Sequence, residues 1–116
     1  MDVYHIWCNL KPGVRDLEFV ASARAYLDHL KEGGNLADYR ITRCKLGLAP
    51  PQLREWHLTL EFEGLPQLDA AFSEVSTRFN PVESFHHAVN SKVQDAFFAL
   101  YRDFPDPQRL TGQEKF

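Results

Sequence analysis

The side chains best suited to acid–base chemistry and to ligand binding recur at every second position in two short segments, 3–10 and 56–63. Both segments are rich in aromatic and β-branched residues, so each is predicted to be a strand. Alternate residues of a strand point to the same face, so three such side chains of each segment share one face. The six residues are His5, Trp7, Asn9, His57, Thr59 and Glu61.

A histidine opposite a carboxylate has a fixed tautomer and a raised basicity, which suits a general base. If the two strands pair antiparallel about their centres, the facing pairs are His5 with Glu61, Trp7 with Thr59, and Asn9 with His57. We therefore predict that His5 is a catalytic general base and that Glu61 orients it. Asn9 is predicted to donate hydrogen bonds to a substrate carbonyl or a developing enolate.

A planar or aromatic ligand would need flat walls and polar contacts beside these catalytic groups. We predict that the ligand-binding residues are Trp7, His57, Thr59 and Tyr101. In a competing interpretation, the same face binds no ligand. In that interpretation its polar side chains form a hydrogen-bonded layer that holds two copies of the chain together.

Metal and thiol chemistry have less support in the sequence. The two imidazoles and the carboxylate of this face could bind a metal ion, but the chain has no His-x-x-x-His or Cys-x-x-Cys spacing, so we predict no metal and no cofactor. Neither Cys8 nor Cys44 has a base beside it in the sequence, which argues against a thiol nucleophile. His86 and His87 would point about 100° apart on a helix, so we interpret them as a surface residue beside a partly buried one.

The composition is that of one ordinary soluble domain. The chain has 116 residues, with 13 Lys or Arg against 16 Asp or Glu, a net charge of −3. Because no basic excess is clustered, we expect neither nucleic acid nor an anionic membrane as a partner. No apolar run approaches the ~20 residues that span a bilayer. The start of the sequence lacks the basic region and apolar core of a secretory signal, so we predict a cytoplasmic protein.

Seven segments have the periodicity of a strand or a helix. Strands are predicted over 3–10, 36–46, 56–63 and 95–104, and the last of these could instead continue the helix before it. Helices are predicted from the N-cap Asp16 to Gly33-Gly34, from Gly64-Leu65-Pro66 to Asn80-Pro81, and over 85–93. We expect one domain over residues 1–107 and a loose tail over 108–116.

The resulting order, β-α-β-β-α-(α)-β, folds most simply into one four-stranded antiparallel sheet with the helices on one face. The predicted strand order is 4-1-3-2, the ferredoxin-like α+β arrangement. The covered face is expected to carry Tyr4, Ile6, Cys8, Leu10, Trp56, Leu58, Leu60 and Phe62. The open face then carries too many large aromatic side chains to leave in water on a monomer. We predict a homodimer in which two open faces pack together.

This element order resembles that of the dimeric α+β barrel superfamily, as does an opening strand that carries His5, Trp7 and Asn9. The superfamily includes the stress-responsive A/B barrel proteins and the antibiotic-biosynthesis monooxygenase-like domains. The runs 86–91 and 99–105 also look like those of a small bacterial family of unknown function. The resemblance implies two sheets that close a barrel around cavities lined by inward residues. In the monooxygenase-like relatives, inward Asn, Trp, His and Tyr side chains serve cofactor-free oxidation of aromatic substrates.

Two functions are therefore consistent with the sequence. The first is a homodimeric barrel protein that binds a small, partly aromatic molecule, with cofactor-independent oxygenase or isomerase activity. The second is a non-catalytic, stress-related dimeric module with no substrate. A cavity of roughly 300 Å³ or more that His5, Trp7 and Asn9 reach would favour the first, and a packed interface would favour the second.

Overall fold

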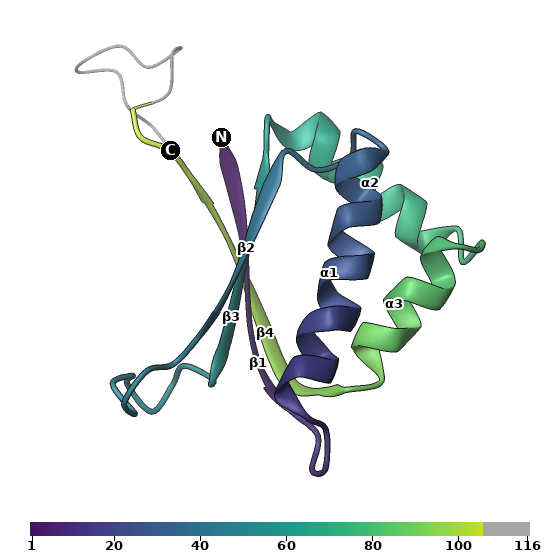
Figure 1. Ribbon diagram of the computed structural model, residues 1–116. Coiled ribbons are helices and arrows are strands. Elements are labelled where there is room, and N and C mark those ends of the chain that lie inside the picture. Colours follow the sequence, from purple (N-terminus) through teal and green to yellow (C-terminus); the bar gives the residue numbers. More distant parts are fainter. Residues whose placement is uncertain (106–116) are drawn as a thin grey trace.

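The structure is a computed structural model, and it describes residues 1–105 (Figure 1). Its elements in chain order are β1 (Asp2–Leu10), α1 (Asp16–Glu32), β2 (Asp38–Arg43), β3 (Trp56–Phe62), α2 (Leu65–Ser76), α3 (Val82–Asn90) and β4 (Val93–Arg102). The third helix and the final strand are both present, which removes the helical alternative for the last segment. None of the helices over residues 1–105 is long and apolar enough to cross a membrane. The predicted tail, 108–116, lies outside the described residues.

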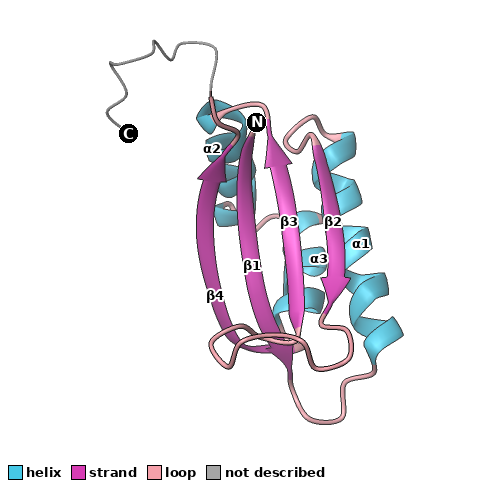
Figure 2. Cartoon of the chain, turned by 90° about the vertical axis from the view of Figure 1, so that its left-hand side faces the viewer, coloured by secondary structure: helices cyan, strands magenta, loops and turns pink. Residues whose placement is uncertain are grey.

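The four strands form one antiparallel sheet in the order β2-β3-β1-β4, and the helices lie together on one of its faces (Figures 1 and 2). Read from the opposite edge, this is the predicted order 4-1-3-2. The ferredoxin-like α+β prediction is therefore confirmed. The other face, which Figure 2 presents to the viewer, is covered by none of the helices of residues 1–105.

The covered face carries the hydrophobic core. Along β3 the residues alternate between buried and half-buried positions over the whole strand, as a period of two requires. The helix α1 adds buried side chains at spacings of three and four, namely Phe19, Ala23, Leu27 and Leu30. Cys8 lies among them, and burial raises the pKa of its thiol to about 11. This cysteine is therefore a small apolar core residue and not a nucleophile.

Several helix ends follow local signals, but α2 ends at Ser76, earlier than predicted, α3 spans Val82–Asn90 in place of 85–93, and the N-cap of α1 also differs. The N-cap of α1 is Arg15, and Asp16 is the first helical residue, whose carboxylate forms an ion pair with Arg43 at 3.0 Å. The helix ends as predicted at the glycine pair, where Gly34 adopts the left-handed conformation with φ +80°. Pro66 occupies the first turn of α2, where its missing N–H is not needed.

The loop between β2 and β3, residues 44–55, folds across one end of the open face (Figure 2). The strand β2 ends at Arg43, earlier than predicted, because Leu46 has a φ of 58°, which a strand does not accommodate. The side-chain oxygen of Asn9 accepts a hydrogen bond from the backbone N–H of Glu55 at 3.2 Å. The loop is therefore anchored to β1 on this face.

Candidate functional site

Three aromatic rings from β1 and β3 stack at the centre of the open face: His5, Trp7 and His57. The rings of Trp7 and His57 are 4.5 Å apart and within 3° of parallel. The ring of His5 lies 5.3 Å from Trp7 and 5.2 Å from His57. His5 Nδ1 and His57 Nε2 are 2.9 Å apart, so one ring donates a hydrogen bond that the other accepts. The accepting ring has to be neutral.

The strand β4 extends this cluster on the same face. Phe97 stacks on Trp7 at 5.3 Å, and the ring of Tyr101 meets His5 edge-on at 5.1 Å. The guanidinium of Arg54, from the loop 44–55, covers the ring of Phe97 at 5.2 Å. We call His5, Trp7, His57, Phe97 and Tyr101 the open-face cluster.

The expected pairing of β1 with β3 is wrong by two residues. His5 lies opposite Thr59 and Trp7 lies opposite His57, whereas Glu61 lies opposite Val3. Glu61 is therefore not the residue facing His5. A shift of two residues returns the same side chains to the same face, so the alternation in the sequence determines the face and leaves the register open.

His5 consequently lacks the carboxylate that was expected to raise its basicity. Desolvation by burial lowers the pKa of His5, and it lowers that of His57 together with a smaller contribution from the His5 charge. The face is also open in the single chain. The roles assigned from the sequence stay predictions that require a second protomer: catalysis by His5, Asn9 and Glu61, and ligand binding by Trp7, His57, Thr59 and Tyr101.

Within residues 1–105, His5 and His57 have no third metal ligand beside them. Among residues 1–105, no group of three or more His, Cys, Asp or Glu side chains is placed to hold a metal ion. Glu61, the carboxylate considered with His5 and His57, lies beside Val3. Cys8 and Cys44 are both free thiols.

A ligand-sized cavity lies on the opposite face, between the sheet and the helices. Its volume is about 460 Å³, which is within the range of small-molecule sites. Aromatic and aliphatic side chains from β1, β3, β4 and all three helices form most of its walls. None of the seven site residues predicted from the sequence lines it. A cavity reached by His5, Trp7 and Asn9 would lie on the open face and stays a prediction.

Aromatic rings from three elements surround the mouth of the cavity. The ring of Tyr4 stacks on Phe98 at 5.8 Å and meets Phe72 edge-on at 5.4 Å. Phe72 and Phe98 line the cavity and yet are 46% and 57% exposed. The cavity therefore opens to solvent between α2 and the edge strand β4.

The polar residues that line the cavity include Tyr26 from α1 and His86 from α3, whose ring centroids are 5.8 Å apart. We call this pair the polar end of the cavity. Burial, with smaller contributions from the charges of Glu74 and Tyr4, raises the pKa of Tyr26 to about 12. Burial also raises the pKa of Tyr4. Both phenols stay protonated near neutral pH and can donate hydrogen bonds.

One sequence signal points to this polar end. Tyr4 and Tyr26 lie in the apolar stripes of the first strand and the first helix. A tyrosine in such a stripe places its hydroxyl in the apolar layer between the sheet and the helices, where the hydroxyl needs a hydrogen-bond partner. The two half-buried hydroxyls therefore mark a polar pocket within a largely apolar layer.

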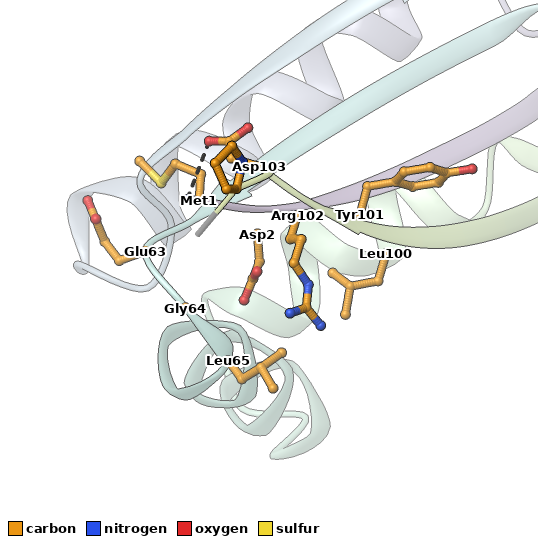
Figure 3. Close-up of a pocket in the computed structure, with 10 residues that line it drawn as sticks. Met1, Asp2, Glu63, Gly64, Leu65, Leu100, Tyr101, Arg102 and Asp103 are labelled. Atoms are coloured by element: carbon orange, nitrogen blue, oxygen red, sulfur yellow. Dashed lines mark ion pairs between the residues drawn. The ribbon is translucent and has the colours of Figure 1, made fainter. Parts of the chain in front are cut away.

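A second hollow of about 640 Å³ lies at the ends of β1 and β4, beside the start of α2 (Figure 3). Asp2 and Arg102 are neighbours on the paired strands, and the Met1 ammonium forms an ion pair with Asp103 at 3.4 Å. Charges of both signs line this hollow. Because small-molecule sites are mainly apolar with a few placed polar groups, the aromatic cavity is the better candidate.

Solved structures with little sequence identity share this fold. A cofactor-independent oxygenase from Streptomyces nogalater, SnoaB, superimposes with a TM-score of 0.65 at 6% identity, covering 93% of this chain and 98% of its own. A dimeric ferredoxin-like protein of unknown function from Thermobifida fusca gives 0.58 at 15%, covering 87% and 90%. A protein of the DABB family from Mesorhizobium loti gives 0.57 at 17%, covering 88% and 95%.

These likenesses place the fold in the ferredoxin-like class to which the dimeric α+β barrel proteins belong, as the sequence indicated. No curated protein matches the chain. The chain belongs to a family of unknown function, DUF6614, which matches it over residues 1–116.

Proposed function

We propose that this protein is a homodimer that binds a small, flat, partly aromatic molecule in the cavity between its sheet and its helices. The observation that carries the proposal is the cavity itself, with a volume of about 460 Å³, mostly apolar walls and a few polar groups. A planar ring can lie against the aromatic surface that Tyr4, Phe72 and Phe98 provide at the mouth.

The open-face cluster supports the homodimer. Its rings contact one another and most of them are half-buried in the single chain, while Tyr101 is 63% exposed. A second copy of the same face would cover these rings around a two-fold axis, which is the commonest arrangement of soluble oligomers. The ferredoxin-like protein from Thermobifida fusca, which shares the fold, is described as dimeric.

The catalytic form of this proposal is a cofactor-independent oxidation or isomerisation of the bound molecule. Its support is the fold shared with SnoaB, a cofactor-independent oxygenase. Such chemistry needs side chains beside the ligand that exchange protons with it. Tyr26 and His86 stand in that position in the cavity, whereas His5, Asn9 and Glu61 would act only on a ligand held between two protomers.

The alternative function is a dimeric module without a substrate. One observation on the open face favours this alternative. His5, the predicted general base, is already hydrogen-bonded to His57 and stacked within the cluster, which suits a protein interface better than proton abstraction.

Ligand binding is tested with 2-naphthol as the probe, by isothermal titration calorimetry. Phe98→Ala removes one wall of the mouth, so its affinity should fall roughly three- to tenfold, as expected for the loss of one aromatic contact. Phe79→Ala is the matched control, because Phe79 is 74% exposed and does not line the cavity. Equal affinity in the wild type and both variants would contradict the proposed site.

A further inference from the structure

Three polar side chains that line the cavity, Tyr4, Tyr26 and His86, have no hydrogen-bond partner among residues 1–105. No hydrogen bond to any other residue in the range 1–105 is made by the hydroxyls of Tyr4 and Tyr26 or by the ring of His86. Neither hydroxyl is sealed from solvent, because the fully enclosed, unpaired polar atoms of this part of the chain are Trp56 Nε1 and Glu83 Oε2. The hydroxyls therefore remain accessible from the cavity.

We infer that Tyr26 and His86, assisted by Tyr4, bind an uncharged oxygen substituent of the aromatic ligand, a hydroxyl or a carbonyl, and select against an anionic one. This inference rests on the proposed function and adds the chemical class of the ligand. A polar group left unpaired in an apolar cavity loses its hydrogen bonds to bulk water. A site built in this way favours a ligand that supplies the missing bond over one that lacks it.

The side chains at this end of the cavity can both donate hydrogen bonds to a ligand and accept them from it. A phenol hydroxyl donates to a carbonyl or hydroxyl oxygen of a ligand. An imidazole in its neutral form has one donor and one acceptor nitrogen, and in that form the ring of His86 accepts from a ligand hydroxyl. Tyr26 and His86 line the same cavity with ring centroids 5.8 Å apart, so one ligand can contact both.

The charge beside Tyr26 favours a neutral ligand. Glu74 on α2 raises the pKa of Tyr26 through its charge, so its negative potential reaches the polar end. Its two carboxylate oxygens accept hydrogen bonds from His29 Nε2 at 2.8 Å and Asn35 Nδ2 at 2.7 Å, which hold it in place. A carboxylate on the ligand would meet like charge here.

One cation, Arg78, also lines the cavity. Its side chain is 69% exposed, and its guanidinium lies 3.7 Å from the carboxylate of Glu83. Solvent and this acidic partner therefore reduce the attraction that Arg78 would exert on an anion.

Three probes of one shape test this inference: 2-naphthol, naphthalene and naphthalene-2-carboxylate, each titrated into the full chain by calorimetry. The wild type should bind 2-naphthol about tenfold more tightly than naphthalene, the effect of one hydrogen bond to an otherwise unpaired group. It should bind the carboxylate more weakly than 2-naphthol.

Two variants locate the hydrogen bonds. Tyr26→Phe and His86→Leu should each lower the affinity for 2-naphthol about fivefold and leave the affinity for naphthalene unchanged. The unchanged binding of naphthalene shows that the cavity is intact. Tyr39→Phe and His87→Leu carry the same substitutions outside the cavity lining and should match the wild type for all probes.

The outcomes separate the two proposals. If no probe binds to the wild type, the proposed function fails and this inference fails with it. If all three probes bind equally, if the carboxylate binds most tightly, or if Tyr26→Phe and His86→Leu match the wild type, the inference is overturned and the proposed function stands.

Discussion

The two faces of the sheet use aromatic side chains in different ways, and neighbouring residues of β4 show the difference. Phe97 stacks on Trp7 in the open-face cluster, beneath the guanidinium of Arg54. Phe98, on the other face, stacks on Tyr4 at the mouth of a cavity. Aromatic rings that contact one another on an uncovered face suit a protein partner, whereas rings around an empty volume suit a small molecule. In the proposed function, one sheet therefore separates association from ligand binding.

The largest expected effect concerns the covered face. Phe62 is fully buried, so Phe62→Ala should lower the free energy of unfolding by about 3–5 kcal/mol through lost burial and the cavity left behind. Phe79→Ala, at a 74% exposed position, should change it by less than about 0.5 kcal/mol. Urea unfolding followed by circular dichroism measures both. A similar loss in the two variants would contradict the assignment of the core.

The next effect concerns the open face. Trp7→Glu places a charge at the centre of the proposed interface, where two copies would face each other, so the dimer dissociation constant should rise roughly 30-fold or more. Light scattering over a concentration series measures it. Leu17→Glu adds the same charge at a 79% exposed position of α1 and should leave the dimer unchanged. A monomeric wild type at micromolar concentration would contradict the homodimer.

The histidine pair of the open face is expected to have a smaller effect, on the pH dependence of stability. The pKa values of His5 and His57 lie below the ordinary value of 6.5 in the folded protein, so the unfolded chain binds more protons near that pH. The stability that these residues contribute is therefore complete above pH 6.5, and it is lost as the pH falls from 6.5 through the lowered pKa values. The thermal midpoint should decrease over that interval.

Measurements at one fixed protein concentration keep dimerisation from changing the comparison. The double variant His5→Gln/His57→Gln retains hydrogen-bonding side chains and removes the two titrating groups. Its thermal midpoint should depend less on pH between 7 and 5 than that of the wild type. Identical pH profiles would show that the pair contributes nothing to this dependence.

The sequence was sufficient to predict the faces of the sheet. Apolar and polar residues alternate strictly along β3. In a strand this places Trp56, Leu58, Leu60 and Phe62 on one face of the sheet and His57, Thr59 and Glu61 on the other. The strand order followed from short, uncrossed connections. These features depend on local periodicity, which is visible in a single sequence.

The register and the cavity could not be read from the same pattern. A shift of two residues between β1 and β3 preserves both faces, so nothing local distinguished Glu61 from Thr59 as the residue opposite His5. The cavity depends on how far α2 and α3 stand from β4, a distance that apolar spacing does not encode. Its polar residues, Tyr26 and His86, come from separate helices and meet only in the folded chain.

A crystal structure of the protein with 2-naphthol tests the separation of the two faces most directly. We predict that the probe lies between α2, α3 and the edge of β4, with its oxygen at Tyr26 and His86, and that the open faces of two protomers pack together. A probe bound against His5, Trp7 and Asn9, with the cavity under the helices empty, would contradict this account.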